Sequence, residues 1–293
     1  MDTPLVSVIM NCYNSSEYLK EAIDSVVSQT YQHWEIIFWD NQSTDKSAEI
    51  FKGYADNRFR YFYAERHTPL SEGRNLAIAR ATGEYLAFLD CDDLWAPEKL
   101  EAQMAFFTKN PEVGIVYTPF EILLNSDSQE VAGYNAMFLR LRYEGHGPED
   151  IYRRLLFKNY IIFSSVVLRK SVFDRTDGFS DDYRQNEDYE ILLKCARLSL
   201  GACTAAHLVR YRLHASNNTL KNDERNFLET RSIYAGLPRD KYVTEAISRN
   251  EVRFGLYRLI YQKRIDGLKL FFQRHSLRML YQILRQRYFE KGG

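Results

Sequence analysis

Three aspartates are crowded into the tetrapeptide Asp90-Cys91-Asp92-Asp93, directly after an apolar run. That run, Tyr85-Leu86-Ala87-Phe88-Leu89, has the length and composition of a buried strand, which places the acids at its carboxyl end. Like charges at such a position repel unless a cation or a shared proton relieves them. Oxygen ligands favour Mg²⁺ or Mn²⁺, and such ions keep positions open for substrate phosphates. The tetrapeptide therefore indicates a divalent metal at a site for a diphosphate.

A structural explanation covers part of this pattern, because Asp is common in turns and frequently caps the helix that follows a strand. Pro97 suits the first turn of a helix, which makes Asp93 a candidate cap. That alternative leaves the carboxylates of Asp90 and Asp92 unexplained. The metal interpretation therefore depends on whether the rest of the chain supplies a matching site.

A second pair of acids, Glu187-Asp188, opens a predicted helix that extends to Leu198. At helical spacing, Glu187 shares a polar stripe with Glu190, Lys194 and Arg197. The carboxylate of Asp188 is predicted to point inward, because it shares its stripe with Ile191, Leu192 and Cys195. One explanation for Asp188 is a buried cap favoured by the helix dipole. The other is a general base that reaches an acceptor hydroxyl in a crevice.

Polar segments also follow the first two predicted strands. Asn11-Cys12-Tyr13-Asn14 comes after the first strand and Asp40-Asn41 after the second. The carboxyl ends of parallel strands line the crevice of an α/β sheet, although turn chemistry alone explains either segment equally well. The residues that we expect to contact the nucleotide from these segments are Asn11, Tyr13, Asn14, Asp40 and Asn41.

Two further side chains, Arg74 and His214, are candidates for the same site. Arg74 lies at the start of a predicted helix just before the acid-bearing strand. A guanidinium there can meet a diphosphate or a base edge, or it can simply lie on the helix surface. His214 follows the last predicted strand, where it is either a structural residue or a further metal ligand.

The elements that must position these residues form a regular series. Short apolar runs alternate with helical periodicity over the first 120 residues, which is typical of a parallel sheet with helices on its faces. We expect irregular sequence over 124–148, a helix over 151–157 and helices beyond Ser216, with a break at Leu237-Pro238. The predicted strands are 6–10, 35–39, 59–63, 85–89, 113–118, 161–168 and 208–213.

Composition excludes several classes of protein. The chain has 293 residues, of which 45% are hydrophobic, so it can bury a substantial core and is not disordered. Lys plus Arg and Asp plus Glu both number 39, so no overall charge favours nucleic acid as a partner. The charge is uneven, because residues 251–293 contain ten Lys or Arg against three acids. This basic end is either a solvated face or an attachment to an anionic membrane.

Cysteine usage and the N-terminus predict the compartment. The four cysteines are widely spaced without a C-x-x-C pair, so neither a disulfide framework nor a zinc knuckle is indicated. Residues 1–10 lack a basic segment, and their apolar stretch is too short for a signal peptide. No window of eighteen apolar residues predicts a membrane span. We therefore expect a cytoplasmic protein, with peripheral attachment to the cytoplasmic membrane face as an option for its basic end.

Taken in chain order, these motifs resemble those of the family 2 glycosyltransferases of GT-A fold. The resemblance runs from Val6 to about Asn218, roughly three quarters of the chain. It implies a mostly parallel sheet flanked by helices, with a donor-binding half over 1–123, an acceptor-binding half over 124–220 and a helical basic extension over 221–293. The motifs that carry it are Val6 to Asn14, Ser28-Gln29-Thr30-Tyr31, Glu35 to Asp45, Gly73-Arg74-Asn75, Thr82-Gly83-Glu84-Tyr85, the D-x-D motif at Asp90 and Asp92, Gly178-Phe179 and Glu187-Asp188.

The resemblance also implies roles for the site residues. Asp92 would bind Mn²⁺ or Mg²⁺ on the diphosphate of a nucleotide sugar, and His214 would complete the metal shell. Asp90 would contact the ribose or an ion-bound water. Asp188, supported by Glu187, would deprotonate an acceptor hydroxyl, and a single displacement inverts the anomeric centre. The implied acceptor is a glycan or a lipid-linked saccharide, as in cell-surface polysaccharide synthesis.

One departure from the family pattern concerns the base of the donor. The family commonly has two aspartates after its second strand, and here the pair is Asp40-Asn41. An amide accepts from a pyrimidine N3–H but also donates, and uridine is the expected base. The sugar, the linkage and the acceptor depend on pocket shape and are not encoded in these motifs.

Two alternatives stay open at this point. A nucleotidyltransferase on a related sheet also uses paired acids and a divalent ion, but Asn11-Cys12-Tyr13-Asn14 is not the glycine-rich, basic loop that such enzymes use for a triphosphate. A non-catalytic nucleotide-sugar-binding subunit is the other alternative, and the presence of both Asp92 and Asp188 disfavours it.

Overall fold

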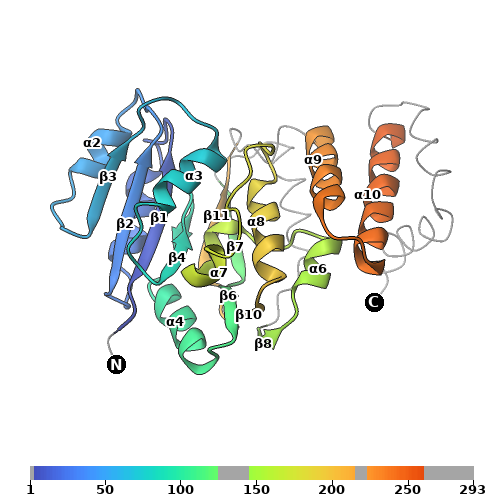
Figure 1. Cartoon of the computed structure of the whole chain (residues 1–293). Helices are drawn as coiled ribbons and strands as arrows, with labels where there is room; N and C mark the ends of the chain where they lie inside the picture. The colour runs from blue at the N-terminus through green and yellow to red at the C-terminus, as the bar shows by residue number, and fades with distance from the viewer. Residues whose placement is uncertain (1–2, 125–144, 215–222, 261–293) are drawn as a thin grey trace. The chain divides into compact units, whose positions relative to one another are not determined.

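The computed structural model describes residues 3–124, 145–214 and 223–260, and the chain divides into two compact units (Figure 1). Unit 1 comprises Met1–Tyr152 and Asn159–Leu220, and unit 2 comprises Arg153–Lys158 and Lys221–Gly293. Every site residue that the sequence predicts belongs to unit 1.

A large sheet forms the centre of unit 1. Among the described residues it has eight strands, in the order β3-β2-β1-β4-β9-β6-β10-β8. Strands β3, β2, β1 and β4 are parallel to one another, and β6 is parallel to β10. Strands β9 and β8 run antiparallel to their neighbours. The strands are β1 (Val6–Cys12), β2 (Trp34–Asp40), β3 (Phe59–Tyr63), β4 (Tyr85–Phe88), β6 (Val113–Tyr117), β8 (His146–Glu149), β9 (Val167–Arg169) and β10 (Leu200–Cys203).

The register of the parallel strands brings their carboxyl ends to one edge of the sheet. Cys12 of β1 pairs with Asp40 of β2, and Ile9 of β1 pairs with Phe88, the last residue of β4. The turns that follow β1, β2 and β4 therefore begin close to one another. This edge is where open α/β sheets bind their ligands.

Helices pack on the sheet through apolar stripes. In α1 (Leu19–Val27), residues Leu19, Ala22, Ile23 and Val26 recur at helical spacing, and all four are buried. Two other helices carry predicted site residues, namely α3 (Leu70–Ile78) with Arg74 and α8 (Glu187–Ala196) with the acid pair. The remaining helices described in unit 1 are α2 (Ser47–Lys52), α4 (Lys99–Lys109) and α7 (Lys170–Phe173).

A smaller sheet of unit 1 connects two parts of the predicted site. It places His214 near the segment Asp90–Asp93, which we call the acid turn. Its three strands in the described residues are ordered β5-β11-β7. β5 begins directly after Asp93, and β11 pairs antiparallel with it. His214 follows the last residue of β11. The strands are β5 (Leu94–Trp95), β7 (Phe120–Leu124) and β11 (Val209–Leu213).

The structure confirms the α/β class, the mostly parallel sheet and the five strands expected before residue 120. The prediction of a strand over 161–168 is wrong, because Phe163–Ser165 form a 3-10 helix and β9 begins only at Val167. The expectation came from the apolar residues Ile161, Ile162, Phe163, Val166, Val167 and Leu168, whose hydropathy does not show that Ser164 and Ser165 interrupt the strand. The irregular segment expected over 124–148 lies mostly outside the described residues, apart from the start of β8.

Unit 2 is helical in its described part, as the sequence predicts. It contains all but the first residue of α6 (Tyr152–Phe157), together with α9 (Asp223–Gly236) and α10 (Lys241–Ile260), with the expected break between the last two. The rings of Phe227 and Phe254 stack at 5.4 Å, and Tyr234 Oη donates to the carbonyl of Leu156 at 2.5 Å. Of the helices that the structure describes, none combines the length and the apolar character that crossing a membrane requires. Most of the basic residues predicted to attach to a membrane lie outside the described residues.

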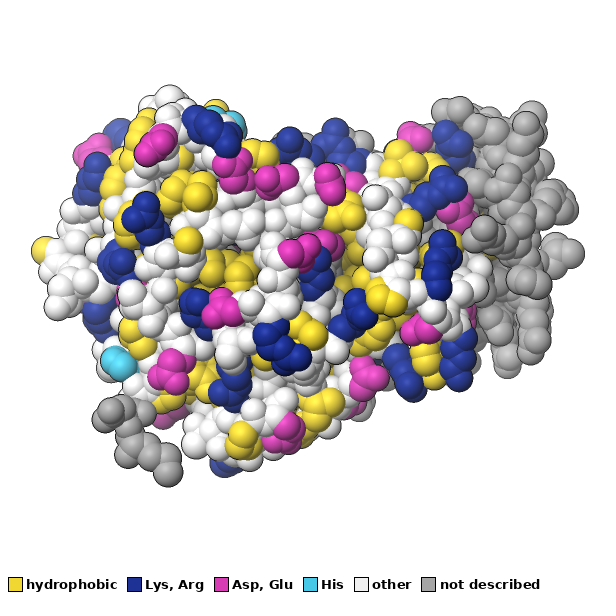
Figure 2. All heavy atoms as spheres, viewed as in Figure 1, with side chains coloured by type: hydrophobic (Ala, Val, Ile, Leu, Met, Phe, Trp, Pro, Cys, Tyr) yellow, Lys and Arg dark blue, Asp and Glu magenta, His cyan; other side chains and the backbone are white. Residues whose placement is uncertain are grey.

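Basic and acidic side chains are interspersed over the face of the molecule in Figure 2. Lys20 pairs with Asp24 and Lys170 with Asp174, each one helical turn apart. The mixture agrees with the net charge of zero.

Candidate active site

The acid turn is held in place by Ser164 and Arg212, which lie far from it in the sequence. The backbone N–H of Asp90 donates to Ser164 Oγ at 3.2 Å. The backbone N–H of Arg212 donates to Asp93 Oδ1 at 2.9 Å, and Arg212 Nε donates to the carbonyl of Asp92 at 2.8 Å. Asp93 is fully buried, and α4 begins only at Lys99. The alternative that Asp93 caps a helix is therefore wrong, because this carboxylate anchors the turn to β11.

Asp92 and His214 come together at the end of β11. His214 Nε2 lies 3.0 Å from Asp92 Oδ2, although the residues are 122 positions apart in the chain. This is hydrogen-bond distance, and a carboxylate oxygen and an imidazole nitrogen are also groups that would hold Mg²⁺ or Mn²⁺. Within the described ranges, no group of three or more His, Cys, Asp or Glu side chains is placed to hold an ion. Any ion here would take its other ligands from substrate oxygens and water.

Arg74 links the acid turn to the second pair of acids. Its Nη1 donates to Glu187 Oε1 at 2.8 Å, and its Nη2 donates to Asp90 Oδ1 at 3.3 Å. The guanidinium is almost fully buried and lies over the ring of Phe163 at 4.8 Å. Arg74 is therefore an interior bridge between the two predicted motifs rather than a surface residue of its helix.

Glu187 is buried although it lies on a polar stripe of α8. Helical spacing places Glu187 and Glu190 on one polar stripe, and both are buried, at 5% and 9% exposed. Arg74 forms an ion pair with Glu187. Lys194 forms one with Glu190, in which Lys194 Nζ lies 2.6 Å from Glu190 Oε1. A polar stripe meets solvent only when no neighbouring element supplies partners, and here the preceding part of the chain supplies one for Glu187.

Asp188 is half-buried at the first turn of α8, and its environment favours the protonated form. Burial raises the pKa of Asp188 to about 7, and the neighbouring carboxylates of Glu187 and Asp90 contribute to the rise. The Arg74 guanidinium and the Tyr189 N–H, which donates to Asp188 Oδ1, act in the opposite direction. A carboxylate of this basicity can accept a proton near neutral pH, which is what a general base requires.

Burial also raises the pKa of two carboxyl groups in the acid turn. For Asp90 the Arg74 guanidinium opposes this rise, whereas the charges of Asp92 and Glu187 add to it. Asp93 has a pKa well above its usual range because it is buried beside Asp92 and Asp90. Its Oδ2 is buried without a hydrogen-bond partner among the described residues. These carboxyl groups therefore favour their protonated forms, and a bound cation would favour the charged forms instead.

The predicted donor-binding residues at the second turn make internal contacts. Asp40 is fully buried, accepting from the Ser43 N–H at 2.7 Å and from Tyr61 Oη at 2.6 Å. Asn41 is bound on both sides of its amide by Thr68. A direct contact of either side chain with a base stays a prediction.

The first turn places its three predicted residues in different settings. Asn14 adopts a φ of 51°, and its Oδ1 accepts from the Thr44 N–H at 2.7 Å, which fixes the turn. Asn11 Nδ2 is buried without a partner in the part of the chain that the structure describes. Tyr13 is 53% exposed at the edge of the sheet. Its ring is therefore available to a ligand at this edge.

Three neighbours of the site were not predicted from sequence: His67, Ser164 and Arg212. Arg212 is buried in β11, the middle strand of the smaller sheet, and a charged residue beside the apolar end of a predicted strand is the one sequence signal for it. Ser164 has no such signal, since serine is ordinary in a turn. His67 lies in a loop with several polar residues, and its ring contacts Tyr13 with centroids 4.5 Å apart.

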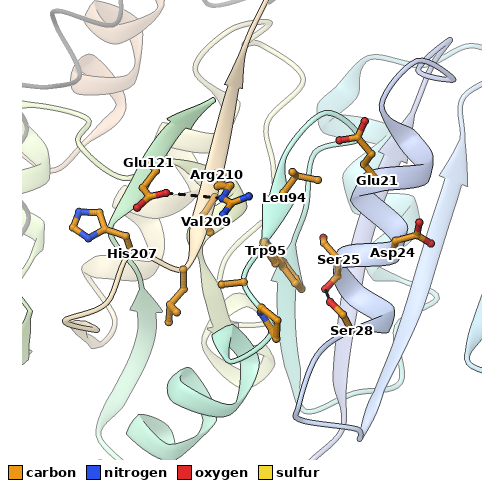
Figure 3. Close-up of a pocket in the computed structure, with 13 residues that line it drawn as sticks. Glu21, Asp24, Ser25, Ser28, Leu94, Trp95, Glu121, His207, Val209 and Arg210 are labelled. Carbon is orange, nitrogen blue, oxygen red and sulfur yellow. Dashed lines mark hydrogen bonds and ion pairs between the residues drawn. The ribbon is translucent and has the colours of Figure 1, made fainter. Parts of the chain in front are cut away.

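A separate cavity of about 530 Å³ lies between α1 and the smaller sheet (Figure 3). Its rim carries Glu21, Asp24 and Glu121, and Arg210 Nε lies 3.9 Å from Glu121 Oε2. None of the predicted site residues lines this cavity. The residues that carry the predicted chemistry therefore form a different site, at the carboxyl edge of the large sheet.

Fold and site define a nucleotide-binding type of α/β protein with paired acids at the sheet edge, and comparison with known proteins gives the family. The model of the family Glycosyl transferase family 2 matches residues 7–175. The chain is 33% identical over 195 residues to an Escherichia coli protein, the UDP-Glc:alpha-D-GlcNAc-diphosphoundecaprenol beta-1,3-glucosyltransferase WfgD. That match covers 66% of this chain and 70% of WfgD. The chain belongs to glycosyl transferase family 2 and is a glycosyltransferase, as the motifs predicted.

A second relative matches a shorter part of the chain. The chain is 43% identical over 105 residues to TuaG of Bacillus subtilis (strain 168), whose name places it in teichuronic acid biosynthesis. This match covers 35% of the chain and only 42% of TuaG.

Solved structures show the same fold at low sequence identity. S. aureus TarS 1-349 in complex with UDP-GlcNAc superposes with a TM-score of 0.66 at 17% identity, over 90% of this chain and 75% of that one. The longer TarS structure is matched over only 44% of its length. The mannosyltransferase PcManGT from Pyrobaculum calidifontis, in complex with GDP-Man and Mn2+, gives a TM-score of 0.61 at 17% identity, over 98% and 80% of the two chains. These likenesses confirm the GT-A-type fold.

Proposed function

We propose that the chain is an inverting, metal-dependent glycosyltransferase that moves a sugar from a nucleotide diphosphate sugar to a hydroxyl of a glycan or a lipid-linked saccharide. One observation carries the proposal. The Arg74 guanidinium bridges Asp90 of the acid turn and Glu187, the neighbour of Asp188, so that the donor and acceptor motifs share one polar cluster. The carboxylate of Asp188, with a pKa of about 7 beside this cluster, suits a general base and so favours sugar transfer over a nucleotidyltransferase or a binding-only subunit.

The side chains at the acid turn and beside it offer ligands that suit a divalent cation. Asp92 and His214 would hold Mn²⁺ or Mg²⁺, while Asp90, turned towards Arg74, would contact the ribose or an ion-bound water. When bound, such an ion acts as a Lewis acid that neutralises charge on the leaving diphosphate. The Mn2+ in the complex of PcManGT supports this choice by analogy of fold.

The chain's own residues would divide the remaining chemistry between them. Asp188 would take the proton of the acceptor hydroxyl as that oxygen attacks the anomeric carbon from the face opposite the diphosphate. Glu187 would support Asp188 by keeping its pKa high and by fixing the first turn of α8 through Arg74. A single displacement of this kind inverts the anomeric configuration.

The donor and acceptor classes come from the relatives and the neighbours. WfgD is named for UDP-Glc and a diphosphoundecaprenol acceptor, and TarS is solved with UDP-GlcNAc. PcManGT carries GDP-Man instead, so the fold accommodates more than one base. We assign a UDP-sugar as donor, with Asn11, Tyr13, Asn14, Asp40 and Asn41 at the nucleoside end.

Attachment to an anionic membrane through the basic residues 251–293 fits an acceptor presented on lipid. This segment carries ten Lys or Arg against three acids. The chain is expected to sediment with anionic vesicles at low salt and to be released at high salt, since electrostatic attraction is screened. Replacing Arg278, Arg285 and Arg287 with Gln should weaken the sedimentation. Equal sedimentation of both proteins would remove this part of the proposal.

The central test combines donor binding with turnover. A thermal-shift panel of UDP, GDP and CDP with and without Mn²⁺ should raise the melting temperature most for UDP with the ion, because a ligand that binds only the folded form stabilises it. Slow hydrolysis of the matching UDP-sugar should depend on the ion and be lost in Asp188→Ala. Binding without any turnover would indicate a binding subunit, and pyrophosphate release from UTP and a sugar phosphate would indicate a nucleotidyltransferase.

A further inference from the structure

The amide residues after β2 hold a loop in a way that carboxylates could not. Asn41 Nδ2 donates to the carbonyl of Thr68 at 2.8 Å, while Asn41 Oδ1 accepts from the Thr68 N–H at 3.0 Å and from Thr68 Oγ1 at 3.1 Å. Gln42 Nε2 donates to the carbonyls of Ala64 and Glu65 at 3.3 and 3.0 Å. An aspartate has only acceptors and could not donate to these carbonyls. The hydrogen bonds to Thr68 therefore explain why this chain has an asparagine at position 41.

The anchored loop carries His67. Its Nδ1 lies 3.0 Å from the backbone oxygen of Asn41. A carbonyl oxygen only accepts, so Nδ1 carries the proton, and in the neutral ring Nε2 is an acceptor. The described residues give Nε2 no partner. One side of the imidazole is therefore fixed by Asn41, and the other presents a lone pair.

His67 also stands against a residue already expected at the nucleoside end. The rings of Tyr13 and His67 meet edge to face, with centroids 4.5 Å apart at an angle of 62°. Both side chains are exposed, although large aromatic side chains are normally buried. Aromatic rings of this kind stack with nucleobases. Tyr13 lies just after β1 and His67 in the loop between β3 and α3, where its contact with Asn41 places it beside the carboxyl end of β2.

We infer that His67 recognises the donor base, with Nε2 accepting a base N–H such as uracil N3–H, and that Asn41 is a positioning residue that holds His67 against Tyr13. This inference rests on the proposed function, since it names the base contact of the same site. It gives Asn41 an indirect role, in contrast to a direct contact of its amide with the base.

The experiment measures equilibrium binding of UDP and of ribose 5-diphosphate, which lacks the base, to the full chain with Mn²⁺. His67→Phe keeps an aromatic ring but loses the acceptor, and it should weaken UDP roughly 3- to 10-fold, the value of one hydrogen bond, without affecting ribose 5-diphosphate. Asn41→Asp should weaken UDP in the same way, because it loses the donor to Thr68. In turnover both variants should raise KM and leave kcat unchanged, as expected when binding is lost equally from ground and transition states.

A matched control is His33→Phe, which replaces an exposed histidine just before β2 at the opposite edge of the sheet and should change neither affinity. Asn41→Gln, which restores an amide, should recover part of the UDP affinity lost in Asn41→Asp. Unchanged UDP binding by His67→Phe, or equal losses for UDP and ribose 5-diphosphate, would overturn the inference. If the wild-type chain binds neither compound, the proposed function fails as well, whereas equal binding of both by the wild type removes only the base contact.

Discussion

Arg74 Nη1 donates to Glu187 Oε1 at 2.8 Å, joining residues 113 positions apart with both side chains buried. The same guanidinium reaches Asp90 in the acid turn. One arginine thus sets the relative position of the two acidic motifs and lowers the repulsion between them. Since catalysis by a GT-A-type enzyme needs both motifs at one crevice, this contact is the structural basis of the proposed active site.

Removing that arginine tests its role. Arg74→Met should cost about 3–5 kcal/mol in the free energy of unfolding, because it leaves the buried carboxylate of Glu187 without a partner. The double variant Arg74→Met, Glu187→Leu should recover much of that loss, yet remain inactive. Urea unfolding measures both effects. The matched control is Arg66→Met, since Arg66 forms an exposed pair with Glu72 and should cost no more than about 1 kcal/mol. A similar cost for the two single variants would contradict the bridging role.

Asp188 should show a conflict between stability and activity. Its pKa is about 7 in the folded protein and about 4 in an unfolded chain. Between these values the folded state holds a proton that the unfolded chain has released, so stability falls as pH rises through that window. Asp188→Asn should therefore be more stable than the wild type at pH 8, by roughly 2–4 °C in melting temperature, and nearly equal at pH 4.

The same residue predicts the pH dependence of turnover. The rate should rise with pH as Asp188 loses its proton near pH 7, and Asp188→Asn should lose about 10³-fold or more in kcat while it still binds donor. Glu17→Gln, a change of an exposed carboxylate before α1, is the control for both readouts. A variant at position 188 that keeps the wild-type rate and pH profile would exclude the general-base role.

The Asp92 and His214 pair predicts metal dependence of donor binding. Asp92→Asn and His214→Gln should each reduce the Mn²⁺-dependent rise in melting temperature produced by UDP, because each removes one of two adjacent ligands. The affinity for Mn²⁺ is expected to fall about 10- to 100-fold in each variant. His207→Gln changes an exposed histidine outside the pair and should behave as wild type. UDP binding that is equally strong with a chelator would exclude the ion.

The sequence predicted the strands because parallel strands of a covered sheet are continuous apolar runs, and it predicted the acids because charge directly after such a run is unusual. It could not predict the partner of Glu187, since helical periodicity tells which residues share a face and not what covers that face. Asn41 illustrates a similar limit. The family pattern suggested a contact with the base, whereas the donor and acceptor of its amide are both used by Thr68, a pairing that depends on the path of a loop.

Gly178 lies in the segment that leads into the second acid pair, Glu187-Asp188, and its conformation yields a further prediction. It adopts a φ of +75°, and a Cβ there would lie 2.8 Å from Asn75 Oδ1. Asn75, next to Arg74 on α3, holds both the N–H and the carbonyl of Phe179, at 3.0 and 2.8 Å. Gly178→Ala should therefore destabilise the fold by about 1–3 kcal/mol and displace the segment that leads into α8. Gly147→Ala, where a Cβ meets nothing within 4 Å, is the matched control and should be nearly neutral. Urea unfolding and kcat of the two variants decide the matter, since a Gly178→Ala protein with wild-type values in both would show that this contact does not position the acids.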